Sequence, residues 1–188
     1  DSITTIKENA FKDATSLLTI NTKANEIDSN AFNNTAFSKS FTDGIVNFNG
    51  ILLQYTGHAS NVVIPSDVKI IGKNAFKGNS KVVTIHIPTN VETIKESAFE
   101  NCFALKEIIV DGKASSLNDI ENNAFSNCIS LENISFSSTI NKIGEYAFYN
   151  CYKLKNITLE SEYLSIIEKY SFANCNSLDD IKLSSSIV

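Results

Sequence analysis

A pair made of a small residue and phenylalanine recurs seven times inside one repeating frame of this chain. The pairs are Ala10-Phe11, Ala31-Phe32, Ala75-Phe76, Ala98-Phe99, Ala124-Phe125, Ala147-Phe148 and Ser171-Phe172. The last five phenylalanines are about 23 to 26 residues apart, which is the period of a repeat architecture. A unit of this length cannot cover its own apolar face and becomes stable only when neighbouring units stack on it. The pair therefore predicts a stacked array with one continuous internal column of phenylalanines.

Each of the later pairs lies in a longer frame of apolar positions. An Ile opens the frame, and Cys, Leu, Ile and a second apolar residue stand three, six, nine and eleven residues after the Phe. The sixth copy has the complete set, namely Ile143, Ala147, Phe148, Cys151, Leu154, Ile157 and Leu159. This length is typical of one leucine-rich repeat. We predict a leucine-rich repeat solenoid, a right-handed curved coil with a parallel β-sheet of short strands on one face and short helical or 3₁₀ turns on the other.

Two parts of the frame have different periods. The segment from Lys155 to Leu159 alternates polar and apolar residues, which is the pattern of a half-buried strand. Between the Ala-Phe pair and the following Leu, apolar residues recur every three positions, which fits short helical or 3₁₀ turns. We therefore expect one strand per repeat on one wall and the turns on the opposite, convex wall.

We predict a single leucine-rich repeat domain over residues 1–188, with about eight repeats. One of these, within residues 37–65, is degenerate because it has no Ala-Phe pair. Turn signals at Gly44 and Asn49-Gly50 bracket apolar runs that end at Phe48 and Tyr55, which predicts a hairpin. Because the chain opens without Met, we also expect it to be a piece of a longer protein.

Charge and hydropathy exclude two classes of partner. The chain has 16 Lys and Arg against 21 Asp and Glu, and its basic residues are scattered singly. No basic stripe exists that could follow a phosphate backbone, so we expect no nucleic-acid partner. The longest apolar run, around Ile51 to Tyr55, is far shorter than the roughly 18 to 20 residues that cross a bilayer, so we expect no membrane span within this chain.

The four cysteines occupy one position of successive repeats. Cys102, Cys128, Cys151 and Cys175 are 26, 23 and 24 residues apart, and none belongs to a Cys-x-x-Cys pair. We therefore expect no metal site. Side chains on adjacent coils run parallel about 4.8 Å apart, whereas a disulfide needs Cβ atoms turned together to about 3.8 Å. Free, buried thiols acting as small hydrophobic residues are the expected state, and disulfides are the alternative.

The frame Ile-Gly-x-x-Ala-Phe-x-x-Cys-x-x-Leu-x-x-Ile-x-Leu, found from Ile143 to Leu159, resembles the BspA-like leucine-rich repeats of bacterial and some protozoan surface proteins. The stretch from Asn49 to Gly57, followed by Val62 to Pro65, is similar to an irregular repeat of that family. The resemblance covers nearly the whole chain. It implies an extracellular or cell-surface protein used for adhesion, whose partner is a protein such as a host matrix or surface protein. The fold alone does not fix that function.

The sequence contains no nucleophile with a base, no paired carboxylates and no set of metal ligands. Its two histidines, His58 and His86, have no Ser or Cys partner in the frame, and we expect both to be solvated. We therefore predict a protein that is not an enzyme, with no catalytic, cofactor-binding or metal-binding residues and no cofactor.

The outward strand positions are the candidate protein-binding surface, because solenoids use their concave sheet for extended contacts. These candidate residues are Asn21, His86, Ile109, Ser135, Thr158 and Lys182, flanked by Thr84, Glu107, Asn133, Asn156 and Asp180. The alternative is that these positions need only be soluble and compatible with a strand. Tyr146, Tyr149, Tyr152, Tyr163 and Tyr170 cluster in the last two copies. Exposed tyrosines favour interfaces, although they also cover convex surfaces.

Three functions fit these observations. The first is a noncatalytic, extracellular protein-binding module of the adhesion type. The second is an architectural spacer that holds another domain away from a cell wall. The third is an ancillary domain of a larger secreted enzyme, which the flanking domains of a longer protein would reveal. The sequence names no ligand and no oligomeric state.

Overall fold

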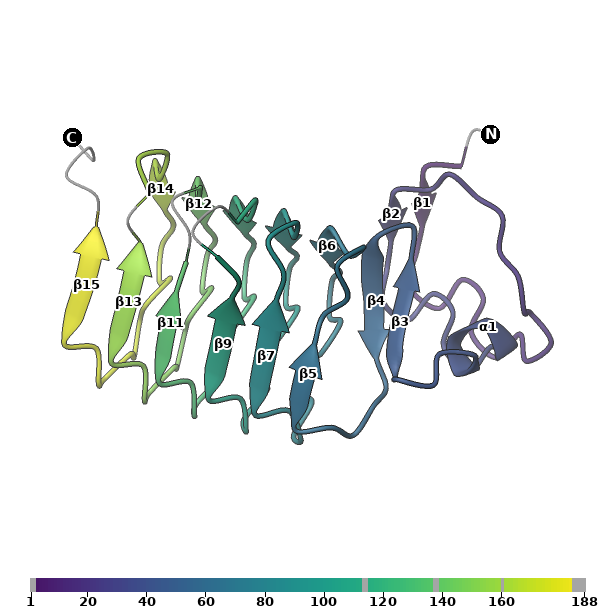
Figure 1. Cartoon of the computed structure of the whole chain (residues 1–188), viewed down its shortest axis with the longest axis horizontal. Helices are drawn as coiled ribbons and strands as arrows, with labels where there is room; N and C mark the ends of the chain where they lie inside the picture. Colours follow the sequence, from purple (N-terminus) through teal and green to yellow (C-terminus); the bar gives the residue numbers. More distant parts are fainter. Residues whose placement is uncertain (1–2, 113–114, 137–138, 160, 184–188) are drawn as a thin grey trace.

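The computed structural model describes residues 3–112, 115–136, 139–159 and 161–183. The chain forms an elongated β-solenoid of about eight stacked parallel turns, with the two ends of the chain at opposite ends of the long axis (Figure 1). The predicted leucine-rich repeat solenoid is confirmed. In this part of the chain the only helix is α1 (Ala36–Lys39), one turn long.

One wall is a six-stranded parallel sheet, here called the front sheet, with one strand from each of six successive coils. Its strands are β5 (Asn61–Val63), β7 (Thr84–Ile87), β9 (Glu107–Val110), β11 (Asn133–Ser135), β13 (Asn156–Leu159) and β15 (Asp180–Leu183). In each strand the frame Ile, or Val62 in β5, points inward, because alternation along a strand sends neighbouring side chains to opposite faces. This sheet is the one that the alternating segments predict.

A second wall, the back sheet, is made of strands that the sequence analysis did not predict. It contains β6 (Ile70–Ile71), β8 (Thr93–Ile94), β10 (Asp119–Ile120), β12 (Lys142–Ile143) and β14 (Ile166–Ile167), continued by the hairpin of β4 (Ile51–Tyr55) and β3 (Ile45–Phe48). Each of these five parallel strands is only two residues long, too short to show an alternating pattern. The Ile that opens each frame is the inward residue of this wall. A separate parallel pair, β1 (Thr5–Ile6) and β2 (Glu26–Ile27), precedes it.

Between the back and front sheets the chain makes separate turns instead of a helix. In the fifth copy, for example, the amide of Cys128 donates to the carbonyl of Phe125 at 3.1 Å and that of Leu131 to Cys128 at 3.0 Å. These are bonds of the 3₁₀ type, as the spacing of apolar residues predicts. No helix propagates because left-handed residues interrupt the turns two positions before and two after nearly every Phe. The positive-φ residues at these positions are Asn9, Asp13, Asn34, Asn74, Gly78, Ser97, Asn101, Asn123, Asn127, Tyr146, Asn150, Tyr170 and Asn174.

The phenylalanines of the later copies form a column along the solenoid axis. Neighbouring rings from Tyr55 through Phe76, Phe99, Phe125 and Phe148 to Phe172 are stacked, with centroids 5.0, 5.0, 5.1, 5.1 and 5.2 Å apart. This stacking confirms the predicted column for the third to seventh copies. The thiol of each frame Cys lies beside the column and donates to the Phe carbonyl of the preceding coil, as Cys128 does to Phe99 at 3.2 Å.

The predicted single column is interrupted, because the β3–β4 hairpin divides the core in two. Alternate residues of β4 face opposite ways: Leu52 packs in the core of the later copies, and Leu53 packs in the core of the first two. Phe32 stacks on Phe11 at 5.4 Å but meets Phe48 of the hairpin at a tilted 6.4 Å instead of joining Tyr55. The hairpin is thus a partition with two buried faces.

Candidate protein-binding surface

The outward residues of the front sheet form one row across six strands. The strand register pairs Val63 with His86 and His86 with Ile109, and pairs Ser135 with Thr158 and Thr158 with Lys182. The pairing of Ile134 with Ile108 joins the two halves of the row. Parallel strands in register place these side chains about 4.8 Å from their neighbours. The structure therefore brings together five of the six residues that the sequence analysis selected.

Asn21 is the residue that does not belong to the row. The chain around it forms no strand, and Asn21 lies at the N-terminal end of the solenoid, on the rim of a hollow beside Ile20 and Thr22. The prediction that Asn21 continues the row is wrong, because the hairpin partition separates the first two coils from the front sheet. Val63 takes the end of the row instead. The alternation in Asn61-Val62-Val63-Ile64, which leaves Val63 exposed between two buried residues, is the signal that could have found it.

A second row lies beside the first at the start of each strand. The register aligns Thr84 with Glu107, Glu107 with Asn133, Asn133 with Asn156 and Asn156 with Asp180, as the sequence analysis expected. Within it the side-chain amide of Asn156 donates to Asn133 Oδ1 at 3.2 Å. These two rows together give a surface of polar side chains with an apolar part at Val63 and Ile109, which can lie along an extended partner.

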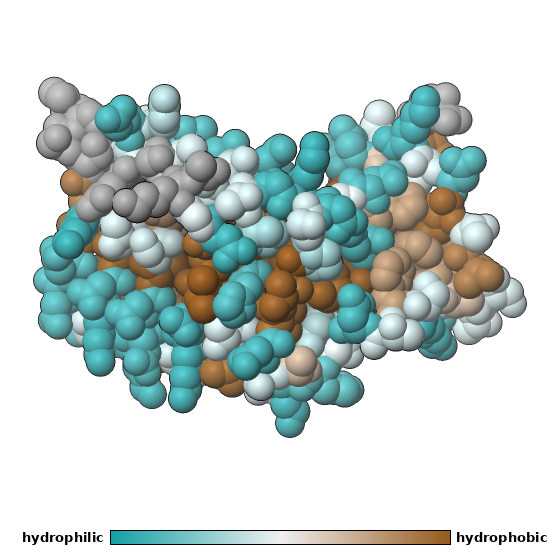
Figure 2. Space-filling model, in the orientation of Figure 1, coloured by the Kyte–Doolittle hydropathy of each residue, from teal (hydrophilic) through white to brown (hydrophobic). Residues whose placement is uncertain are grey.

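The character of this surface changes along the axis. Val63 is 67% exposed and Ile109 is half-buried, so one half of the row is apolar around His86. The other half ends in Thr158 and Lys182. Figure 2 shows hydrophobic colour over the middle of this face and at the N-terminal end, and hydrophilic colour over β13 and β15. A partner that covers the face would need an apolar part opposite β5 to β9 and a polar part beyond it.

The reactive groups of the chain lie outside this surface. The four cysteines are free, and Cys102, Cys128 and Cys151 are buried. Burial raises the pKa of Cys102 to about 12 and that of the partly buried Cys175 to about 11, and it raises the pKa values of Cys128 and Cys151 well above 9. Thiols that hold their proton so tightly are poor nucleophiles and poor metal ligands. Over the described ranges no three His, Cys, Asp or Glu side chains gather as a metal site.

Three of the five clustered tyrosines gather on the turns that follow the back sheet. Tyr146 and Tyr170 stack at 5.1 Å, and Tyr149 meets Tyr146 edge to face at 5.3 Å. Both stacked residues adopt positive φ, 56° and 58°. Tyr152 and Tyr163 are exposed elsewhere on the coil and have no ring contact with this group among the described residues.

The geometry defines a leucine-rich repeat protein of the short, strand-and-turn kind. The model of the BspA type leucine rich repeat region, in six copies, matches residues 1–49, 47–119 and 114–188. The chain therefore belongs to the BspA-type leucine-rich repeat family. No significant match was found among curated proteins.

Several solved structures share this fold. A leucine rich cell surface protein from Faecalibacterium prausnitzii is 28% identical with a TM-score of 0.70, covering 98% of this chain and 52% of that one. A leucine-rich repeat protein from T. pallidum is 29% identical with a TM-score of 0.66, covering 70% and 62%. The pneumococcal vaccine antigen PcpA, at 18% identity and a TM-score of 0.65, shares the fold over 87% of this chain and 44% of its own. The chain spans less than two thirds of each of these proteins.

Among the described residues, no helix has the length and hydropathy to cross a bilayer.

Proposed function

We propose that this chain is a noncatalytic, cell-surface or secreted protein-binding module of the adhesion type, and that its contact surface is the outer face of the front sheet. The observation that carries the proposal is the continuous row from Val63 to Lys182, which is regular across six strands and whose side chains are exposed or half-buried. Solenoids use such sheets for extended contacts. The similarity to a protein described as a leucine rich cell surface protein supports the location.

The surface favours a protein partner by its chemistry. It offers side chains that accept and donate single hydrogen bonds, interrupted by an apolar stretch at Val63 and Ile109. Interfaces combine apolar and polar contacts, and this row offers an apolar end at Val63 and Ile109 and a polar end at Thr158 and Lys182. The thiols of Cys102, Cys128 and Cys151 are buried, and His86 lies half-buried within the row between Val63 and Ile109, where it can take part in the contact.

Binding to purified matrix and host-surface proteins tests the proposal. The chain is passed over immobilised candidates and the saturable signal is measured by surface plasmon resonance. We expect the double variant Val63→Asp and Ile109→Asp to reduce affinity by about tenfold or more, since it places charges in the apolar part of the contact. A double variant Phe103→Asp and Tyr152→Asp, with two equally exposed aromatic residues on the turns, is the matched control.

Two outcomes would contradict the proposal. If the turn variant abolished binding and the sheet variant did not, the contact surface would lie on the turns. If no saturable binding were found with any candidate, the architectural spacer would be the better interpretation. Attachment of the chain between two folded domains, followed by measurement of their separation, would then test the spacer directly.

A further inference from the structure

The front sheet has a free edge within the chain, at β5. The order of its strands ends at β5, which pairs with β7 on one side and with no described strand on the other. Figure 1 shows β5 as the last arrow of this sheet, beside the β3–β4 hairpin. Because the hairpin and the first two coils precede β5, this edge is produced by the fold of the degenerate repeat.

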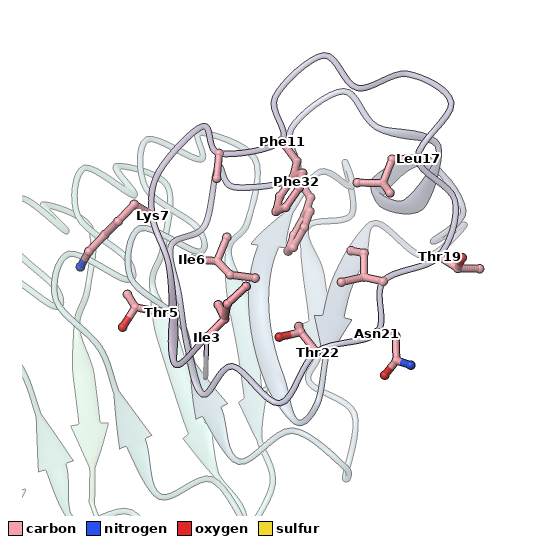
Figure 3. Close-up of a pocket in the computed structure, with 12 residues that line it drawn as sticks. Ile3, Thr5, Ile6, Lys7, Phe11, Leu17, Thr19, Asn21, Thr22 and Phe32 are labelled. Atoms are coloured by element: carbon pink, nitrogen blue, oxygen red, sulfur yellow. The ribbon is translucent and has the colours of Figure 1, made fainter. Parts of the chain in front are cut away.

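None of the preceding described segments supplies a front-sheet strand next to β5. The hairpin strand β4 pairs with β6 in the back sheet, and the second coil has α1, and no strand, between Phe32 and the hairpin. In the first coil, Asn21 lies on a loop at the rim of the N-terminal hollow, as Figure 3 shows. The connection from Tyr55 to β5 is short, and its residues 58–60 are exposed. The edge of β5 is therefore left without a strand of the described chain beside it.

The main chain of β5 presents four unpaired groups at this edge. In a parallel ladder both main-chain groups of one residue bond to the same neighbouring strand, and those of the next residue point to the opposite side. The amide of Ile64 donates to the carbonyl of His86 in β7 at 3.0 Å. Asn61 and Val63, which lie three residues and one residue before Ile64, therefore direct their amides and carbonyls to the free edge. No partner for these four groups lies among the described residues.

The side chains along the edge are exposed as well. Val63 is 67% exposed, whereas His86, its register partner in β7, is half-buried between two strands. Asn61 is exposed, whereas its register partner Thr84 is half-buried. A strand edge with open main-chain groups is a template for pairing with another strand. The exposed Val63 adds an apolar surface that a residue of such a strand would cover.

The chain also limits how long the added strand can be. β5 is three residues long, and Pro65 follows it at the position that Asp111 holds two coils later. The amide of Asp111 donates to the carbonyl of Ile87 in the preceding coil at 2.9 Å, but Pro65 has no amide to donate. The edge therefore fits a segment of about three to four residues and disfavours the long pairing that leads to aggregation.

We propose that the edge of β5 binds an extended segment of a partner protein, which adds to the front sheet as a further strand. Main-chain hydrogen bonds to Asn61 and Val63 would supply the affinity, and the side chains of alternate residues would supply the specificity. An apolar residue of the segment would lie beside Val63 and continue the row on the outer face. This inference rests on the proposed function, because it states how the partner of the front sheet is held.

A strand peptide in an NMR titration tests the proposal. The probe is the capped peptide KLKNITL, which copies residues 153–159 and includes β13, a strand that pairs along both of its edges in the front sheet. In the isotopically labelled chain we expect the amide signals of Asn61 and Val63 to shift saturably. Their exchange with solvent should slow about tenfold when the free peptide is at about ten times its Kd. The amides of Val62 and Ile64, which face β7, should change little.

N-methylated peptides test whether the main chain of the probe makes the contact. Alternate amides of a strand point to opposite edges, so methylation of the amides at 155 and 157 and methylation of those at 156 and 158 block different edges of the peptide. We expect one of the two methylated peptides to lose binding and the other to retain it. The two peptides have the same side chains and the same number of methyl groups, so each is the control for the other.

Variants of Val63 separate the roles of the main chain and the side chain. Val63→Pro removes the amide that points to the free edge but leaves the hydrogen bonds between β5 and β7, because proline is tolerated on edge strands. We expect this variant to bind the peptide about tenfold more weakly or worse. Val63→Thr keeps the amide and the β-branched shape, and as the matched control it should bind within about threefold of the original chain. Circular dichroism checks that both variants are folded.

Several outcomes would overturn the inference. Amides of Asn61 and Val63 that do not respond to the peptide, or two methylated peptides that bind alike, would show that the edge does not accept a strand. Protection of the same amides without peptide, together with self-association in sedimentation, would assign the edge to a second copy. A protein partner that binds Val63→Pro as tightly as the original chain would leave the proposed function standing without strand addition. Peptide addition at β5 with no binding to any candidate protein would instead count against the proposed function alone.

Discussion

Tyr55 stacks on Phe76 with ring centroids 5.0 Å apart, and its amide donates to the carbonyl of Ala75 at 2.8 Å. The same bond joins Phe to Ala of the next coil in the regular copies, so Tyr55 holds the aromatic position of the degenerate repeat. Its buried hydroxyl accepts a hydrogen bond from the amide of Ala59 at 3.0 Å. A tyrosine is tolerated in the column because that polar group is satisfied.

The aromatic column carries much of the stability of the later copies. We expect Phe125→Ala to lower the free energy of unfolding by about 3 to 5 kcal/mol, because the ring is fully buried between two others and leaves a cavity. Urea denaturation measures the change. Phe103→Ala, at an exposed position four residues after Phe99, is the control and should cost far less. Equal losses for the two variants would contradict the column as the core.

The hairpin partition predicts that the two cores can be weakened separately. Leu52 and Leu53 are adjacent and both fully buried, but they face different cores. We expect each change to Ala to cost about 2 to 5 kcal/mol through cavity formation. Hydrogen exchange should show Leu53→Ala accelerating exchange mainly around Phe32, and Leu52→Ala mainly around Phe76. The same exchange pattern in both variants would mean that one cooperative core spans the partition.

On the turns, the side chains of Asn101, Asn127, Asn150 and Asn174 form a ladder of hydrogen bonds from coil to coil. Asn127 has two physical roles in it that substitutions can separate. Asn127 has φ of 60°, donates to Asn101 at 2.9 Å and accepts from Asn150 at 2.7 Å. We expect Asn127→Ala to cost about 2 to 4 kcal/mol, from left-handed strain and two lost side-chain bonds. Asn127→Gly removes the strain but not the bond loss, so it should cost less. Thermal unfolding compares the stability of the two variants. If the Gly variant were as unstable as the Ala variant, backbone strain would be ruled out as a cause.

The buried thiols predict a loss of stability at alkaline pH. Burial raises the pKa of Cys102 to about 12, above its ordinary value of 9.0, so the folded state keeps a proton that the unfolded state releases. The contribution of Cys102 to the free energy of unfolding is complete below the ordinary pKa of the thiol. It is lost as the pH rises from about 9 toward the pKa of the folded state, at up to about 1.4 kcal/mol per pH unit.

Urea unfolding under reducing conditions at a series of pH values measures how the free energy of unfolding falls with pH. Cys128→Ala removes one titrating thiol while keeping a small residue, as Ala14 stands at the same position of the first copy, and should flatten the slope. In alkylation experiments the partly buried Cys175 should react before the other three. A slope unchanged by Cys128→Ala would show that other groups dominate the alkaline transition.

Most of the candidate surface could be predicted from the repeat pattern of the sequence. His86, Ile109 and Thr158 could be placed in one row from sequence because each stands ten residues after its Phe, and equal positions of a solenoid must align. Asn21 obeys the same count but lies outside the row, since the count assumes that every coil stacks directly on the next. The back sheet was missed for a different reason. Its two-residue strands have no periodicity to detect, and only pairing with neighbouring coils makes them strands.

What the sequence by itself determined is the repeating unit: the inward Phe, Cys, Leu and Ile, the front-sheet strand and the turns, because each follows from a local pattern repeated at a nearly constant length. What only the tertiary structure decided is how unequal coils meet. The partition at Leu52 and Leu53 and the presence of Tyr55 in place of Phe in the aromatic column both depend on which coil lies beside which. The physical reason is that stacking is a contact between distant residues, and a local pattern fixes the shape of each coil without fixing its neighbour.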